Sequence, residues 1–171
     1  MRNKNPFTPT SKKNKTVKCA LQSIDLWMRT LKQYITTIKQ TIIIPKATPK
    51  QVYDAYTDPK KHSEFTESKA TGKPVVGGKY SLWDGYIFGK YLVLDDGKRV
   101  VQDWTTTDWE EGYPASKLEL TFCAIAGGTE ITMMHSGVPK VQVGEVEQGW
   151  MEFYWNPLKE YFNKELSSPQ T

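Results

Sequence analysis

His135 is the residue in this sequence best placed to do acid–base or ligand chemistry. It ends the run "TEITMMH", so in a strand it shares one face with Ile131 and Met133. If that face lines the interior of a sheet, the imidazole could act as a general base or hold a polar group of a ligand. The alternative is a core histidine bonded to a neighbouring carbonyl group, and we favour this interpretation because buried polar groups are nearly always hydrogen-bonded.

Other catalytic patterns are weak. Asp108, Glu110 and Glu111 form a predicted acidic loop that could supply paired carboxylates. Nothing identifiable would bury these carboxylates and raise a pKa, so we interpret the run as a solvated loop. The segment "GKPVVGGK" (72–79) has glycines spaced like a phosphate-binding loop, but Gly78 stands where that loop needs lysine. We expect no catalytic residue in this chain.

The composition is typical of one globular domain. The 171 residues include 25% charged, 38% hydrophobic and 12% aromatic residues, with a net charge of +4. Residues 1–24 hold six basic residues and no acid, so most of the basic excess lies outside the folded part. The folded part therefore lacks the basic stripe that is typical of nucleic-acid-binding domains, and we expect no nucleic-acid partner. Two histidines and two distant cysteines do not provide a metal-binding set, and we expect no metal and no cofactor.

Residues 1–36 read as a basic extension. We expect disorder over 1–16 and an amphipathic helix over about 17–35. Such a helix could be a targeting or membrane-surface segment, but we favour an extension packed on the domain or an over-long start with Met28 as the true initiator. No apolar run reaches the roughly 18–20 residues that cross a bilayer, and the isolated Cys19 and Cys123 fit the reducing cytoplasm.

The remainder, 37–166, predicts an α+β domain followed by a disordered tail at 167–171. A β-branched strand ends at Pro45, and Thr48, Pro49 and Gln51 form a capping signal for a short helix. Asp58 then caps a second short helix. Glycine-containing turns separate six strands, predicted near 67–72, 79–83, 86–94, 98–107, 116–125 and 129–137. Gly89 inside a strand indicates a sharp bend or a close backbone approach.

The C-terminal segment predicts a long helix with a bulky apolar stripe. The stripe repeats at helical spacing through Val143, Val146, Trp150, Tyr154, Leu158 and Tyr161. Pro157 should kink the helix, because it cannot donate to the carbonyl of Phe153. Such a helix needs a wide partner, so we expect one face of residues 81–104 to line a curved sheet around it. The other face of that segment would meet the two short helices or solvent.

A helix laid across a bent sheet often leaves space beside it. Space lined by aromatic and apolar side chains with a few polar groups is typical of a small-molecule pocket. We therefore predict a site for a hydrophobic or amphipathic molecule between sheet and helix, although Trp104 and Trp150 are more often ordinary core residues. The candidate ligand-binding residues are Tyr80, Leu82, Ile87, Trp104, Met133, His135, Trp150 and Tyr154.

Several segments resemble a known family. They are "PKQVYDAYTDP", "VGGKYSLWDGYIFGKYLVL", "RVVQDW", "TEITMMHSGVP" and "GWMEFYWNPLKEYF", and together they span about residues 38–165. They resemble the domain shared by homologues of the activator of the ninety-kilodalton heat-shock-protein ATPase, within the START-like (SRPBCC), helix-grip superfamily. The resemblance implies a seven-stranded antiparallel sheet around a long C-terminal helix, with a cavity between them that takes hydrophobic ligands.

Function follows less directly from this resemblance, because one fold supports many activities. The favoured hypothesis is a binding module without enzymatic activity. A second is a module that docks on a heat-shock chaperone and alters its ATP turnover. Nothing in residues 1–36 resembles the separate N-terminal domain with which eukaryotic activators engage the chaperone. A third is an enzyme of the polyketide cyclase or hydrolase type, in which His135 acts with a carboxylate or a tyrosine.

Overall fold

The computed structural model describes residues 21–24, 26–27, 34–111 and 113–165. The chain divides into two compact units, residues 1–35 and residues 36–171. Residues 21–24, 26 and 27 are helical and fall within the helix predicted over about 17–35. Three predictions lie outside the described residues. They are the disorder over 1–16, the tail at 167–171 and the rest of the predicted helix except residues 34–35.

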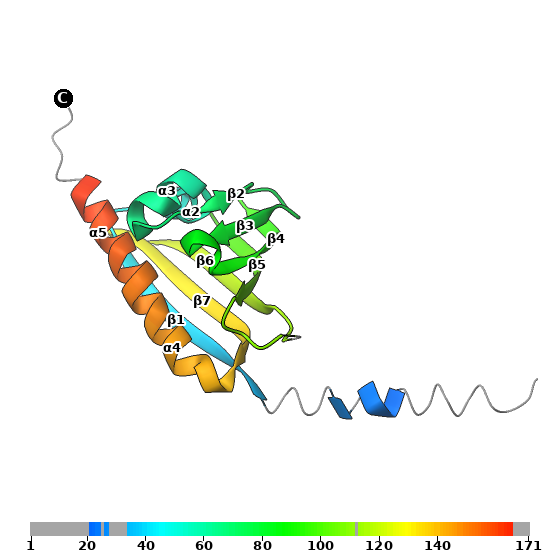
Figure 1. The fold of residues 1–171 in the computed structure, drawn as a ribbon. Helices are drawn as coiled ribbons and strands as arrows, with labels where there is room; N and C mark the ends of the chain where they lie inside the picture. Colours follow the sequence, from blue (N-terminus) through cyan, green and yellow to red (C-terminus); the bar gives the residue numbers. More distant parts are fainter. Residues whose placement is uncertain (1–20, 25, 28–33, 112, 166–171) are drawn as a thin grey trace, which may run out of the picture. The chain divides into compact units, whose positions relative to one another are not determined.

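The second unit is an α+β domain in the order that the sequence predicts (Figure 1). One strand is followed by two short helices, six further strands and a long helical segment. The elements are β1 (Ile35–Pro45), α2 (Pro49–Thr57), α3 (Pro59–Thr66), β2 (Thr71–Gly72), β3 (Lys79–Leu82), the 3-10 turn η1 (Trp83–Gly85), β4 (Ile87–Asp95), β5 (Arg99–Thr106), β6 (Ser116–Ile125), β7 (Gly128–Pro139), the 3-10 turn η2 (Lys140–Gln142), α4 (Val143–Trp150), the π-helical segment η3 (Met151–Trp155) and α5 (Asn156–Glu165).

The seven strands form one curved antiparallel sheet in the order β1-β7-β6-β5-β4-β3-β2. From β2 to β7, each strand pairs with the next strand in the sequence, whereas β1 lies at the edge of the sheet beside β7. The strands agree with the prediction except at β2, where only Thr71 and Gly72 of the strand predicted over 67–72 are in the sheet. The helix-grip fold is thus the observed architecture.

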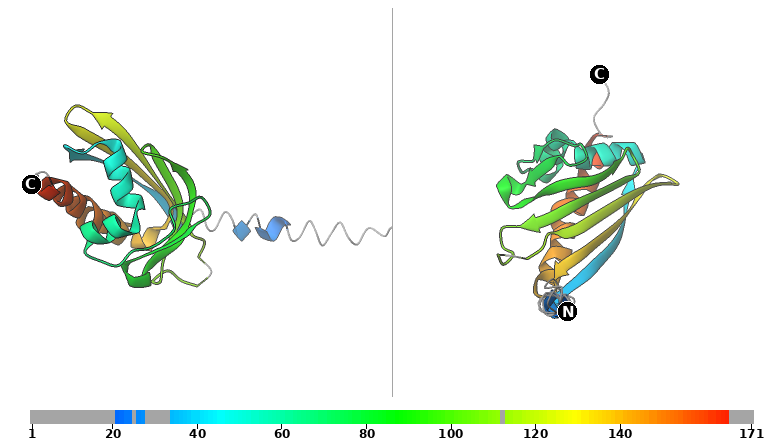
Figure 2. Two further views of the ribbon diagram at one scale, coloured as in Figure 1. Left: turned by 90° about the horizontal axis from the view of Figure 1, so that it is seen from above. Right: turned by 90° about the vertical axis from the view of Figure 1, so that its right-hand side faces the viewer.

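All the helices of this unit pack on the concave side of the sheet (Figure 2). Ser116 and Phe122 point to the same side of β6, since they are an even number of residues apart. Ser116 is linked through His135 to Trp150 of α4, and Phe122 contacts Tyr53 of α2 edge to face. Of the two predicted alternatives for the outer face of 81–104, solvent is therefore correct, and Phe88 of β4 is 42% exposed.

The two short helices begin where their capping residues predict. The Thr48 hydroxyl accepts from the amide of Gln51, whose side chain accepts from the amide of Thr48, and Pro49 occupies the first turn. The Asp58 carboxylate accepts from the amides of Lys60 and Lys61 at the start of α3. These caps fix where each helix starts and hence which of its side chains reach the core.

The C-terminal helix buries the predicted stripe, but with a change of hydrogen-bonding pattern. Trp150, Tyr154 and Leu158 are almost fully buried, while Val143, Val146 and Tyr161 are half-buried. Before Pro157 the helix widens into η3, where the Asn156 amide donates to the carbonyl of Met151, five residues earlier. Because this π-turn adds one residue, Trp155 and Phe162 also face the core.

Gly89 marks the sharpest close approach between β4 and β5. A Cβ atom at this position would lie 2.0 Å from the carbonyl oxygen of Asp103 and 2.9 Å from the hydroxyl of Tyr80. Asp103 is paired with Lys117 of β6, and its carbonyl oxygen accepts from the Tyr80 hydroxyl, so this oxygen cannot move away without disturbing both contacts. The curvature that the sequence predicts at Gly89 therefore depends on the missing side chain.

We expect Gly89→Ala to lower the free energy of unfolding by about 2–3 kcal/mol, as overpacking against backbone does. Gly144→Ala is the matched control, since nothing lies within 4 Å of a Cβ there and the position is helical. It should raise stability by roughly 0.5–1 kcal/mol. Urea unfolding of both variants measures the difference, and equal stabilities would contradict the close approach at Gly89.

Candidate functional site

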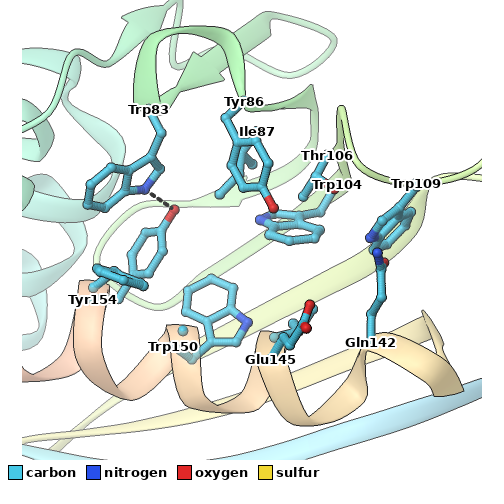
Figure 3. A pocket seen from close by; sticks show the side chains of 13 residues that line it. Trp83, Tyr86, Ile87, Trp104, Thr106, Trp109, Gln142, Glu145, Trp150 and Tyr154 are labelled. Carbon is cyan, nitrogen blue, oxygen red and sulfur yellow. Dashed lines mark hydrogen bonds between the residues drawn. The ribbon is translucent and has the colours of Figure 1, made fainter.

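A pocket of about 350 Å³ lies between the first part of the C-terminal helical segment and the facing end of the sheet (Figure 3). Its lining is mainly aromatic, with four tryptophans, two tyrosines and one phenylalanine. The lining residues are Trp83, Tyr86, Ile87, Trp104, Thr106, Trp109, Gln142, Glu145, Val146, Gly149, Trp150, Phe153 and Tyr154.

Two structural periodicities bring these residues together. On the helical side, residues from Gln142 to Tyr154 recur at spacings of three and four, which place them on one face. On the sheet side, Trp104 and Thr106 alternate onto the concave face at the end of β5, and the loop beyond adds Trp109. The turn η1 supplies Trp83, and Tyr86 and Phe153, 40% and 51% exposed, form the rim.

The rings form a continuous set of contacts around the pocket. The Trp104 ring centroid lies 5.5 Å from that of Trp109 and 6.4 Å from that of Trp150. Trp150 lies 4.4 Å from Tyr154, which in turn lies 6.3 Å from Trp83. These are ordinary distances for favourable aromatic pairs, so the lining is a wall of packed rings.

Trp83 reaches the pocket from a strained backbone. Trp83 and Asp84 have φ angles of 55° and 53°, in the left-handed region that residues other than glycine seldom adopt. The Trp83 indole N–H donates to the Tyr154 hydroxyl at 3.1 Å, and its ring packs edge to face on Phe153. Such strain concentrates at functional sites, so its position beside the pocket supports a functional role for this turn.

Three buried polar atoms of the lining have no hydrogen-bond partner within the described part of the chain. They are the indole Nε1 of Trp104, a donor, the amide Oε1 of Gln142, an acceptor, and the hydroxyl Oγ1 of Thr106, which can do either. At the rim, the Tyr86 hydroxyl donates to a carboxylate oxygen of Asp108 at 2.8 Å. Burial, followed by this carboxylate, raises the pKa of Tyr86. The pocket thus offers a free donor and a free acceptor to a guest molecule.

His135 lies behind the pocket wall, in a chain of three hydrogen bonds. The Trp150 indole N–H donates to its Nδ1 at 3.2 Å, and its Nε2 lies 2.7 Å from the Ser116 hydroxyl. Ser116 itself donates to the carbonyl oxygen of Trp104 at 2.7 Å. An indole can only donate, so Nδ1 carries a lone pair and Nε2 carries the proton of a neutral imidazole.

The surroundings of His135 hold it in this neutral form. Its side chain is fully buried, and burial lowers its pKa to about 3. The alternative favoured from the sequence, a core histidine, agrees with this geometry, but its partners are Ser116 and Trp150 rather than a carbonyl group. With both nitrogens engaged and no surface on the pocket, His135 is not placed to act as a general base there.

The pocket brings together half of the candidate residues from the sequence. Ile87, Trp104, Trp150 and Tyr154 line it. The other four lie outside its lining, buried in the core: Tyr80, Leu82, Met133 and His135. They share the concave face with the lining residues, but α2, α3 and α5 cover other parts of that face. Contact of any of the eight with a ligand remains a prediction.

Sequence reasoning missed several lining residues, among them Trp83, Tyr86, Trp109, Gln142 and Glu145. Trp109 stands alone between acidic residues, and an isolated tryptophan in a polar loop was a usable signal for a functional position. Trp83 and Tyr86 flank the predicted Asp-Gly turn, and a turn in the sequence does not indicate toward which side of the sheet the flanking side chains point. Glu145 reads as an ordinary exposed helix residue, and only the tertiary structure sets it against the pocket.

Within the described ranges, no cluster of three or more His, Cys, Asp or Glu residues is arranged to hold a metal ion. In the same part of the chain, no helix has the length and apolarity needed to span a membrane.

The sequence of this domain matches the family described as Activator of Hsp90 ATPase homolog 1-like protein over residues 46–163. The chain belongs to this family. It is 31% identical over 126 residues to the human activator of 90 kDa heat shock protein ATPase homolog 1. A Dictyostelium discoideum homologue is 29% identical over 120 residues.

These matches cover 74% and 69% of this chain but 36% and 31% of the two relatives, so the chain spans about a third of the relatives' length. Solved structures share the fold. An HSP90 activator from Plasmodium falciparum superimposes with a TM-score of 0.66 at 21% identity, covering 76% of this chain and 96% of that one. CalU16 from Micromonospora echinospora gives 0.60 at 24% identity, covering 77% of each chain.

The two histidines should make the domain acid-sensitive. The Nδ1 atom of His62 donates to the Tyr56 carbonyl at 2.8 Å, and burial lowers the pKa of His62 to about 4. Below pH 6.5 the unfolded chain therefore binds protons at His62 and His135 that the folded domain does not bind. The contribution of the two neutral histidines to the free energy of unfolding is fully present above that pH. It should decrease as the pH drops, by up to about 1.4 kcal/mol per pH unit for each histidine.

The measurement is the free energy of unfolding between pH 6.5 and 5, above the main titration of the carboxylates. His135→Gln should lose stability at every pH, but its pH slope should be smaller than that of the wild type by up to about 1.4 kcal/mol per unit. A slope unchanged by the substitution would show that His135 is not held neutral in the folded state.

Proposed function

We propose that this domain binds a small molecule containing aromatic rings in the pocket between α4 and the sheet. The observation that carries the proposal is the combination of an aromatic wall with three buried, unpartnered polar atoms, Trp104 Nε1, Gln142 Oε1 and Thr106 Oγ1. An unpaired buried polar group costs roughly 1–3 kcal/mol, and a ligand that offers a matching partner recovers that free energy. A volume of about 350 Å³ lies within the range of ligand pockets.

The strained turn at Trp83 and Asp84 supports the same conclusion. A left-handed conformation at two successive non-glycine residues costs free energy that a purely structural turn could avoid by using glycine. Here the cost places an indole over the Tyr154 hydroxyl and against Phe153, at the edge of the pocket. The π-turn η3, which presents Phe153 and Tyr154, is a second irregularity of the kind often found at functional sites.

We propose that the domain binds without catalysing a reaction. The histidine that an enzyme hypothesis requires is neutral, bonded through both nitrogens and behind the wall. Glu145 and two tyrosines are the titratable side chains of the lining within the described residues. Burial raises the pKa of Tyr154, so its hydroxyl stays protonated at neutral pH and serves as a hydrogen-bonding group rather than as a base.

Gly149→Leu tests the site by filling it. A Cβ at Gly149 meets Phe153 at an ordinary 3.7 Å, so a larger side chain enters the pocket without a backbone clash. The matched control is Gly144→Leu on the same helix, where a Cβ contacts nothing and the residue does not line the pocket. Both variants should fold at least as stably as the wild type, since leucine favours helix more than glycine does.

Titration of tryptophan fluorescence with a panel of one- and two-ring aromatic compounds measures the binding. We expect saturable changes for the wild type and Gly144→Leu, and a loss of at least tenfold in affinity for Gly149→Leu. A flat response of the wild type across the panel would refute binding in this pocket.

A second candidate function is stimulation of a heat-shock ATPase in the cytoplasm. Membership in the activator family and the 31% identity to the human activator favour it. Steady-state ATP turnover of the host's ninety-kilodalton chaperone, with and without the full chain, tests this function. We expect a rise in turnover that saturates with added protein, and no change at saturating concentrations would dismiss the role.

A further inference from the structure

We propose that the molecule bound in this pocket is an organic cation, an amine or quaternary ammonium joined to an aromatic ring. This inference rests on the proposed binding function and specifies the chemical class of the ligand. It follows from the charges in the lining, from the nature of the rings and from the polar atoms that lack partners.

The charge in the lining is negative. Glu145 is its one charged side chain, and within the described residues the lining contains no lysine, arginine or histidine. Glu145 forms no ion pair with any described residue. A second carboxylate, that of Asp108, lies at the rim against the Tyr86 hydroxyl. An anionic guest would lie beside these carboxylates without a counter-charge, whereas a cation would be attracted by them.

The Glu145 carboxylate is directed at the pocket rather than away from it. In Figure 3 its side chain rises from α4 toward the space below Trp104, beside Gln142. Its charge also reaches Tyr86 across the pocket, where it adds a small effect to those of burial and Asp108, which raise the pKa of that hydroxyl. The carboxylate and the free Oε1 of Gln142 are thus two acceptors on one side of the pocket.

The rings of the lining are suited to a positive charge. The face of an aromatic ring is electron-rich, and tryptophan attracts a cation most strongly. Trp83, Trp104, Trp109 and Trp150 come from four different segments and surround the same space. Since these side chains are largely shielded from water, the attraction is stronger than at an exposed surface. The unpartnered donors, Trp104 Nε1 and the Thr106 hydroxyl, would suit an acceptor atom on the same ligand.

Three ligands of nearly equal shape separate charge from size. They are benzyltrimethylammonium, its uncharged isostere neopentylbenzene and the anion phenylmethanesulfonate. Tryptophan fluorescence and calorimetry with the full chain give the affinities at low and high salt. We expect the cation to bind at least tenfold more tightly than the uncharged isostere, and the anion to bind least. The net charge of +4 opposes this order, so nonspecific attraction cannot produce it.

Glu145→Gln keeps the shape of the side chain and removes its charge. It should weaken binding of the cation about five- to tenfold and leave binding of neopentylbenzene unchanged. Glu147→Gln is the matched control, because Glu147 is an exposed acid on the same helix and outside the lining. This control should bind the cation as the wild type does.

The outcomes distinguish the two proposals. If neopentylbenzene binds as tightly as the cation and Gly149→Leu blocks both, the pocket binds ligands but the preference for a cation is wrong. An equal effect of Glu145→Gln and Glu147→Gln would also overturn the role of Glu145. If no compound of any charge binds, and the broader aromatic panel is equally silent, the proposed function itself fails.

Discussion

The structure depends on holding the C-terminal helix against a bent sheet while satisfying the buried indole N–H groups of its two tryptophans, Trp150 and Trp155. Trp150 donates to His135, and the chain continues through Ser116 to the carbonyl of Trp104, linking α4 to β7, β6 and β5. On the other side, the Trp155 indole donates to Gln40 of β1 at 2.6 Å, and Gln40 donates to the carbonyl of Glu147. These bonds fix the rotation of the helix, because an apolar contact alone would tolerate sliding.

The pocket is a consequence of this arrangement. The rings of Trp150 and Trp155 stack with their centroids 5.1 Å apart, and both side chains are almost fully buried between the helix and the sheet. Rigid rings cannot adapt to a changing gap as methionine or leucine does. Toward the start of α4 the facing side chains therefore form a wall instead of a continuous core. Trp104 belongs to both regions, since its carbonyl ends the hydrogen-bond chain and its indole lines the pocket.

Local features of the fold could be predicted because they are encoded by neighbours in the sequence. The caps at Thr48 and Asp58 need only a side chain and amides within three residues. The buried positions of the C-terminal helix follow from its periodicity, apart from Trp155 and Phe162. Those two were missed because a π-turn before Pro157 shifts the phase by one residue, and the position of such a turn depends on what the helix packs against.

The sequence by itself determined the elements, their order and the need for a wide apolar partner to the C-terminal helix, since propensity, capping and periodicity act over a few residues. The tertiary structure decided which concave side chains meet at the pocket. It joined Ile87, Trp104, Trp150 and Tyr154 and excluded Tyr80, Leu82, Met133 and His135. It also set Glu145 beside the rings. Alternation identifies the inner face of a strand, but position along that face depends on curvature and on where each helix lies, which are set by contacts between residues distant in the sequence.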